Sequence, residues 1–326
     1  MNSAIHILSH TQPLTDYLVK RTLTPEQENS VAGHYIDLIK KLREPGGDKI
    51  DPSAFRAKGA LTVWPDMETG QQDSVFFLDH LIGTILETFP EASKFIEANT
   101  VYTITCLACK DVEKRRNKQS LFFSEFPLFE DSKKAIIPLE DCFDDCFKKE
   151  KQNTVCNVCK NQGHEYQNSL QGSKLPSVLI IALLRMDADD LIFNQTRTPF
   201  PLDLTLKNGY FDQPPAKLPT YKLRGLVLRS GNFHGGHITA LVRDDTVLNT
   251  DQQWAYFDDL SGPHREHKTI EEIKKIASDG KYLSFSPMYF VYERVLKPVD
   301  VLIDALEELK ARLIDLKNKI ATLSVV

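Results

Sequence analysis

A histidine and two aspartates in the last third of the chain have residue types and a spacing that suit a catalytic pair. His237 opens an alternating run that predicts a strand, and Asp258 and Asp259 directly follow a second predicted strand, residues 254–257. Two strands joined by a loop can pair antiparallel, which brings the end of one beside the start of the other. A carboxylate placed there would fix the tautomer of the imidazole and stabilise its protonated form. The alternative is a buried histidine that simply follows a glycine turn.

Two glycines, Gly235 and Gly236, directly precede this histidine. Because they carry no side chains, another backbone could approach the imidazole closely. Together with the two aspartates, they favour a functional histidine over a buried structural one. A narrow channel beside them would admit a thin peptide.

The chain has six cysteines, and four of them form two Cys-x-x-Cys pairs, Cys106 with Cys109 and Cys156 with Cys159. Two such pairs supply the four soft thiolate ligands that tetrahedral zinc requires. The segment between the pairs is longer than in a compact zinc ribbon and predicts an inserted lobe. We therefore expect a structural Zn²⁺ ion. Without it the lobe would lose its order, because metal-binding energy here is folding energy.

The other two cysteines, Cys142 and Cys146, lie in the acidic segment LEDCFDDCFKKE. A nucleophilic thiol needs a lowered pKa, from a helix N-terminus or a neighbouring cation, and acidic neighbours disfavour the thiolate. The spacing of four residues places both on one face of a short helix, where small buried apolar side chains are expected. The sequence therefore offers a general base without a nucleophile.

Composition excludes several classes of protein. A net charge of −5 over 326 residues, with no long basic run, argues against nucleic-acid binding. No apolar run is long enough to cross a membrane, and Met1–Ser9 lacks the charged start of a signal peptide. Cysteines paired for metal suit a reducing compartment, so we expect a protein of the cytoplasm or nucleus.

Other segments must position these residues. The continuous apolar run at residues 175–185 is typical of a strand buried on both faces. Residues 74–89 predict a strongly apolar helix, and Asp73 stands where it could cap that helix.

These motifs resemble the ubiquitin-specific proteases, a family of papain-like deubiquitinating enzymes. TYKLRGLVLRSGNFHGGHITALVR followed by WAYFDDL is similar to the family's histidine box. The resemblance implies that His237 is the general base, Asp258 the orienting carboxylate and Asp259 an auxiliary polar residue. Two residues depart from the family pattern: Ile238 stands where Tyr is usual, and Arg229 stands where His is frequent.

The start of the apolar helix resembles the family's Gln-Gln-Asp box, matched by Gln71, Gln72 and Asp73. In the family, the aspartate of that box helps to hold the basic C-terminal tail of ubiquitin. The resemblance therefore implies that Gln72 and Asp73, with Gly235 and Gly236, bind substrate. Helix capping is an equally good interpretation of Asp73.

The opening, MNSAIHILSH, resembles the family's cysteine box from its middle onward. By that match the nucleophilic cysteine would lie two residues before Met1, outside this sequence. The protease-like domain would then be incomplete at its N-terminal end.

The resemblance covers nearly all of residues 1–294 and implies an α+β, papain-like cysteine protease fold. It predicts one domain over residues 1–297, with a helical thumb (about 1–99), zinc-binding β fingers (about 100–172) and a β palm (about 173–297). The implied function is thiol-dependent hydrolysis of the isopeptide or peptide bond after the C-terminal Gly of ubiquitin. The alternative is a catalytically inactive scaffold that binds ubiquitin or ubiquitinated proteins.

The last segment, residues 298–326, has a different pattern. Apolar residues from Val299 to Leu323 recur at alternating spacings of three and four, which predicts a heptad-patterned helix. Basic residues flank this seam on both sides, so an acidic helical partner suits it better than a parallel homodimer. Packing on its own domain is the alternative.

Overall fold

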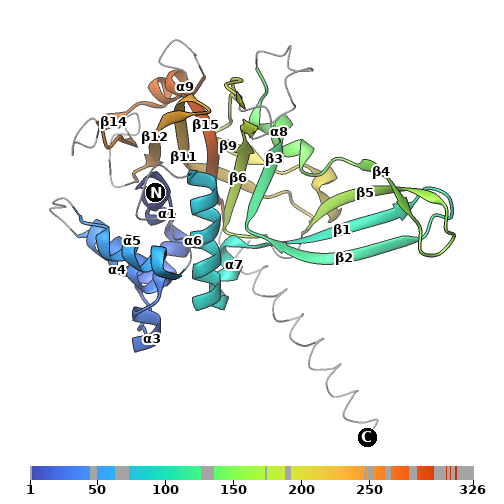
Figure 1. Cartoon of the computed structure of the whole chain (residues 1–326), viewed down its shortest axis with the longest axis horizontal. Helices are drawn as coiled ribbons and strands as arrows, with labels where there is room; N and C mark the ends of the chain where they lie inside the picture. The colour runs from blue at the N-terminus through green and yellow to red at the C-terminus, as the bar shows by residue number, and fades with distance from the viewer. Residues whose placement is uncertain are drawn as a thin grey trace, which may run out of the picture.

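The computed structural model describes residues 2–44, 50–62, 73–125, 136–172, 175–187, 192–245, 247, 253–260, 266–278 and 285–296, together with Leu306, Leu309 and Leu313. Figure 1 shows three regions in this part of the chain. A group of helices forms one side, a large sheet lies against it, and a long arm of strands projects away from both.

The helices of the first region come from the N-terminal part of the chain. They are α1 (Asn2–Ser9), α2 (Gln12–Val19), α3 (Pro25–Glu28), α4 (Val31–Arg43), α5 (Ser53–Thr62), α6 (Ser74–Thr88) and α7 (Ser93–Ile96), with a 3₁₀ turn at Pro90–Ala92. Thr24 begins α3 with a capping box, and Ser30 caps α4 by accepting the N–H of Gly33 at 3.0 Å. These caps satisfy backbone donors that helix starts leave free.

The large sheet has the strand order β14-β13-β12-β11-β15-β6-β3, and β9 also pairs with β11. Its strands are β3 (Leu121–Glu125), β6 (Val178–Leu184), β9 (Asp203–Thr205), β11 (Thr220–Asn232), β12 (Gly235–Arg243), β13 (Trp254–Phe257), β14 (Glu266–Lys268) and β15 (Ser286–Arg294). The pairs are antiparallel except β3 with β6, which is parallel.

Both faces of the large sheet are covered. On one face Val227 packs in a hydrophobic cluster with Leu8 of α1 and Leu78 of α6. On the other face, Leu226 packs in a second cluster that includes residues of α8 (Leu139–Asp145) and α9 (Ile270–Ser278). The apolar run at residues 175–185 supplies β6, whose residues Val178 to Leu183 are all buried, as expected for a central strand covered on both sides.

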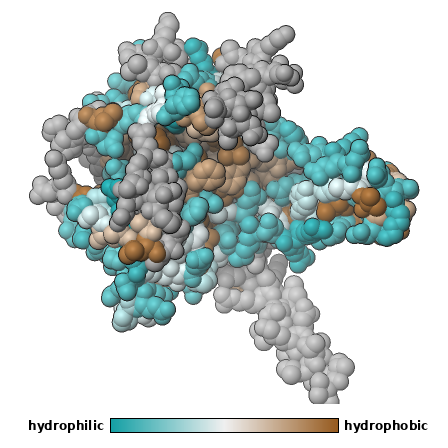
Figure 2. All heavy atoms as spheres, in the orientation of Figure 1, coloured by the Kyte–Doolittle hydropathy of each residue, from teal (hydrophilic) through white to brown (hydrophobic). Residues whose placement is uncertain are grey.

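The arm is a second sheet with the order β10-β5-β1-β2, and β4 also pairs with β5. Its strands are β1 (Ala98–Cys106), β2 (Val112–Gln119), β4 (Glu150–Val155), β5 (Gln162–Gln171) and β10 (Phe211–Gln213). Almost every residue of β2 and β4 is exposed. The exposed apolar residues of β2, β4 and the loop after β4 include Val112, Val155 and Val158. Figure 2 shows apolar residues near the far end of the arm.

Two strands pair in a different sheet from the one expected from sequence. β3 lies within residues 100–172, expected for the fingers, but pairs with β6 of the large sheet. β10 lies within the range expected for the palm, but pairs with β5 of the arm. A short hairpin of β7 (Met186–Asp187) and β8 (Ile192–Phe193) follows β6.

The predicted heptad helix, Val299–Leu323, lies outside the described residues except at three positions. Leu306, Leu309 and Leu313 are helical and more than half exposed. None of the described helices has the length and apolar character needed to span a lipid bilayer.

Candidate active site and metal centre

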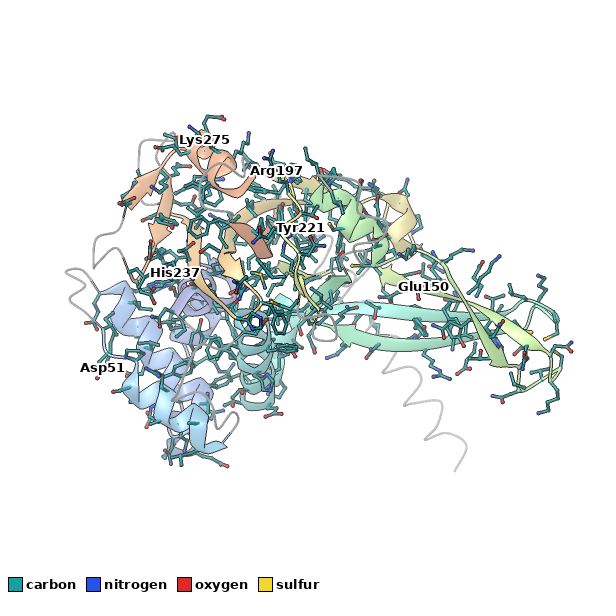
Figure 3. The ribbon with its side chains drawn as sticks, turned by 45° about the horizontal axis from the view of Figure 1, so that its top comes forward. Asp51, Glu150, Arg197, Tyr221, His237 and Lys275 are labelled. Carbon is teal, nitrogen blue, oxygen red and sulfur yellow. The ribbon has the colours of Figure 1, made fainter. Side chains whose placement is uncertain are left out.

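His237 and Asp258 are brought together by the pairing of β12 with β13. The register sets Ala240 opposite Phe257, so the residue after β13 lies close to His237 near the start of β12. His237 Nε2 and Asp258 Oδ1 are 2.7 Å apart, with side-chain exposures of 22% and 15%. Figure 3 labels His237 where the large sheet meets the helical region.

The hydrogen bond between His237 and Asp258 determines which ring nitrogen of His237 can accept a proton. A carboxylate can only accept, so Nε2 carries the proton, and in the neutral ring Nδ1 keeps a lone pair. Asp258 Oδ1 also accepts the backbone N–H of Leu260 at 3.0 Å, which holds the carboxylate in place. Nδ1 faces Asp259, whose Oδ1 is 3.9 Å away. The geometry therefore presents Nδ1 as the nitrogen that can take up a proton.

The N-terminal end of α1 lies beside this pair. Asn2 Nδ2 donates to Asp259 Oδ2 at 3.4 Å, and Ser3 Oγ donates to the carbonyl of Ile238 at 3.5 Å. One turn further on, the His6 ring stacks on Phe257, with centroids 3.9 Å apart and planes 17° from parallel. Sequence reasoning did not single out Asn2, His6 or Phe257. Asn2 and Asp259 are 257 residues apart, and only the folded structure brings them together.

The two glycines before His237 have different roles in the β11–β12 hairpin. A Cβ added to Gly235 would meet no heavy atom within 4 Å, so this position is open, as an approaching backbone would require. A Cβ on Gly236 would lie 2.1 Å from the carbonyl oxygen of Ser230 and 3.1 Å from Cζ of Arg229. The hairpin's own packing therefore requires Gly236. At Gly231, φ is +105°, a conformation that side chains disfavour.

Arg229 anchors this hairpin. The side chain is buried: Nη2 donates to the carbonyl of Asn232 at 2.6 Å, and Cζ lies 4.4 Å from the centre of the Phe193 ring. Burial lowers the pKa of Arg229, and the Asp73 carboxylate partly offsets this. Arg229 thus ties the segment that carries His237 to the β7–β8 hairpin.

Of the two residues matched to the Gln-Gln-Asp box and expected to bind substrate, Gln72 lies outside the described residues. Asp73 caps α6: its Oδ1 accepts the N–H of Val75 at 2.7 Å and of Phe76 at 3.3 Å. The capping interpretation of Asp73 is therefore confirmed.

Four thiols form a compact cluster near the far end of the arm. The Sγ atoms of Cys106, Cys109, Cys156 and Cys159 lie within 4.8 Å of one another. The cross-pair distances are 3.7 Å between Cys106 and Cys159 and 3.8 Å between Cys109 and Cys156. A tetrahedral ion with metal–sulfur bonds of about 2.3 Å requires sulfur atoms about 3.8 Å apart. The thiols therefore fit one tetrahedral metal ion.

The two Cys-x-x-Cys segments adopt the same turn. Lys110 donates its N–H to the carbonyl of Cys106, and Lys160 donates to that of Cys156, each at 3.0 Å. Both lysines have a positive φ, +64° and +60°. Backbone N–H groups from Cys109 and Ala108 lower the pKa of Cys106, which favours the thiolate that binds metal.

Cys142 and Cys146 lie on α8 and at its C-terminal end, apart from both sites. Burial raises the pKa of each thiol to about 12. Both therefore remain protonated thiols, as inert packing residues do.

Comparison with known proteins gives a consistent result. The model of the family described as "Ubiquitin carboxyl-terminal hydrolase" matches residues 1–285. Human ubiquitin carboxyl-terminal hydrolase 21 is 24% identical over 311 residues, which cover 76% of this chain and 54% of that protein. Ubiquitin carboxyl-terminal hydrolase 15 of Schizosaccharomyces pombe is 31% identical over 155 residues, covering 45% of this chain and 13% of that protein. The chain thus spans about half the length of the first of these relatives.

Solved structures show the same fold. A chain in the SAGA DUB module Ubp8/Sgf11/Sus1/Sgf73 bound to monoubiquitin superimposes with a TM-score of 0.70 at 17% identity, covering 91% of this chain and 66% of that one. The same module bound to ubiquitin aldehyde gives a TM-score of 0.70 at 16% identity, covering 91% and 67%. The α+β, papain-like fold predicted from sequence is confirmed.

Proposed function

Because this chain belongs to the ubiquitin carboxyl-terminal hydrolase family, we propose that it forms the catalytic region of a thiol-dependent deubiquitinase. The reaction is hydrolysis of the isopeptide or peptide bond after the C-terminal Gly of ubiquitin. The observation that carries this proposal is the 2.7 Å contact between His237 and Asp258, which leaves Nδ1 directed toward the region at the start of α1.

In this mechanism His237 is the general base and later the general acid. Nδ1 takes the proton of the attacking thiol and returns it to the leaving lysine amine. Asp258 holds the ring orientation and stabilises the imidazolium, and Asp259 supplies a second acidic group beside Nδ1. By the family pattern, the thiol would lie two residues before Met1, close to the N-terminal end of α1. There the helix N-terminus would lower the thiol's pKa.

We assign the other predicted residues to substrate and metal. Gln72, Asp73, Gly235 and Gly236 bind the extended tail of ubiquitin, and the open side of Gly235 supports this for one of the four. The ion held by the four thiolates is Zn²⁺, since a tetrahedral set of four sulfurs is the donor set that zinc prefers. Zn²⁺ here serves structure alone. Ubiquitin or ubiquitinated proteins are the partners, in the cytoplasm or nucleus.

The test is cleavage of ubiquitin carrying a fluorogenic amine on its C-terminal carboxyl, with the full-length protein as catalyst. We expect steady hydrolysis that is lost in His237→Ala, with binding of ubiquitin retained. A mutant that cleaves at the wild-type rate would exclude His237 as the base.

A second candidate function is ubiquitin binding without hydrolysis. It is favoured by the position of the six cysteines, four in the metal cluster and two with raised pKa on and beside α8. The same assay separates the two candidates. Binding of ubiquitin without turnover, and without covalent capture by a ubiquitin vinyl sulfone, identifies a scaffold.

A further inference from the structure

The residues around His237 form a second group of potential metal ligands. One ligand atom each from His237, Asp258 and Asp259 lies within 4.8 Å of the others. We propose that this group binds a divalent transition-metal ion between Nδ1 of His237 and the carboxylate of Asp259, and that the bound ion reversibly blocks the imidazole. The site is distinct from the four-thiolate centre in its place, its donor atoms and its effect.

The distance between the two direct ligands suits a shared ion. Nδ1 of His237 and Oδ1 of Asp259 are 3.9 Å apart, which is too long for a hydrogen bond. With metal–ligand bonds of about 2.0–2.2 Å, two ligands of one tetrahedral ion lie about 3.4 Å apart. Binding of an ion between these atoms would therefore require them to approach by about 0.5 Å, a movement that the exposed Asp259 side chain can make.

The third group, Asp258, prepares the imidazole for this role. A histidine that binds metal through one nitrogen usually donates its other N–H to a carboxylate, which fixes the ring and makes it more basic. Nε2 of His237 has such a bond to Asp258, and Leu260 N–H holds the same carboxylate oxygen. On the other side, Asn2 Nδ2 donates to Asp259 Oδ2, which leaves Oδ1 facing the ring.

Charge and access determine which ions this site would take. Two carboxylates beside a neutral imidazole attract a cation, and Asp259 is 59% exposed, so an ion can arrive from solvent and keep some of its waters. Imidazole with carboxylate suits Zn²⁺, Co²⁺ and Ni²⁺, whereas Mg²⁺ and Ca²⁺ prefer oxygen ligands alone. With only two direct protein ligands, the ion should bind more weakly than in the four-thiolate centre.

Binding would have a direct chemical consequence. The lone pair of Nδ1 that coordinates the ion is the one that would accept a proton from a nucleophile. The same nitrogen cannot do both, so the metal-bound form lacks its general base. This consequence rests on the proposed function, but the binding itself rests only on the geometry.

The experiment uses the full-length protein with its four-thiolate centre loaded with Zn²⁺ and excess metal removed. Equilibrium dialysis against Co²⁺ should add one equivalent of cobalt to the wild type. His237→Gln and Asp259→Asn should lose this equivalent. His234→Gln, which removes an exposed histidine from the same hairpin, should retain it.

Absence of the added equivalent in the wild type would overturn the proposal, and so would its retention in His237→Gln. The zinc content of every variant, unchanged at one equivalent, verifies that the arm remains folded. Hydrolysis of the ubiquitin substrate, where present, should fall with cobalt concentration in step with occupancy. If the protein hydrolyses no ubiquitin, the dialysis result still decides the metal site, so the two proposals fail independently.

Discussion

The metal cluster of the arm and the His237 site are both small groups of polar side chains, but they are assembled in different ways. The four thiols come from two copies of one local turn, each with a left-handed lysine after its second cysteine. The His237 site joins a strand start, a strand end and the first turn of α1. The first is specified locally, and the second depends on the register of the whole large sheet.

The surroundings differ as much as the assembly. The large sheet is covered on both faces by hydrophobic clusters. In the described residues these clusters reach only the base of the arm, at Ala98, Leu170 and Phe211, while β2 and β4 are exposed along nearly their whole length. Apolar burial can stabilise the large sheet, whereas the outer arm has little of it. The arm therefore depends on its metal ion, and the His237 site depends on the packed sheet beneath it.

The largest expected effect comes from removing the metal. Chelation, or Cys156→Ser, should abolish metal binding, whose contribution in small zinc modules is about 10–16 kcal/mol. Hydrogen exchange should become fast in β1, β2, β4 and β5 and stay slow in β6, β11 and β15. Cys146→Ser is the matched control, since this thiol is remote from the cluster, and it should change neither metal content nor exchange in the arm. Uniformly faster exchange in both sheets would contradict the separation of the two regions.

The same contrast explains how much the sequence could predict. Spacing alone identifies Cys106, Cys109, Cys156 and Cys159, because the ligands of each turn are three residues apart and the turn is local. Alternation predicts β12 and β13, and their pairing brings Asp258 to His237.

Other features depend on tertiary structure and gave no signal in sequence. The contact of Asn2 with Asp259 requires that α1 pack on the large sheet through its buried face. The need for glycine at 236 comes from the carbonyl of Ser230 across the hairpin. β3 joins β6 in parallel although a long insertion separates them, which no local pattern specifies.

A second prediction tests whether the His237 site affects activity but not stability. In the full-length protein, Asp258→Asn should lower the rate of ubiquitin hydrolysis by about 10³–10⁴-fold, because the ring loses its tautomer and the stabilisation of its cation. The free energy of unfolding should change by about 1 kcal/mol or less, since the side chain is polar and follows the end of β13. Asp79→Asn, at an exposed position of α6, is the control for loss of one carboxylate and should leave both unchanged. A loss of activity that merely follows a loss of folded protein would make Asp258 a structural residue.

The smallest effect concerns a buried charge, which distinguishes the large sheet from the arm. Glu293 of β15 accepts the N–H of Gln12 at the start of α2 at 2.8 Å and pairs with Arg224. Burial raises the pKa of Glu293 above 4.5, although Arg224 acts in the opposite direction. The folded state therefore binds this proton more strongly than the unfolded state. Stability must then fall as the pH rises from 4.5 through the raised pKa.

Glu293→Gln should remove this dependence, because the amide does not titrate and keeps an oxygen for the N–H of Gln12. Denaturant unfolding at several pH values should show the wild type losing stability relative to Glu293→Gln as the pH rises. Glu266→Gln is the control: it removes an exposed carboxylate paired with Lys268 and should retain the loss of stability that Glu293 causes. In the arm, the hydrogen bond from Lys149 lowers the pKa of Glu165, so this carboxylate should contribute a slope of the opposite sign. Parallel curves for wild type and Glu293→Gln would mean that Arg224 fully offsets burial at this carboxylate.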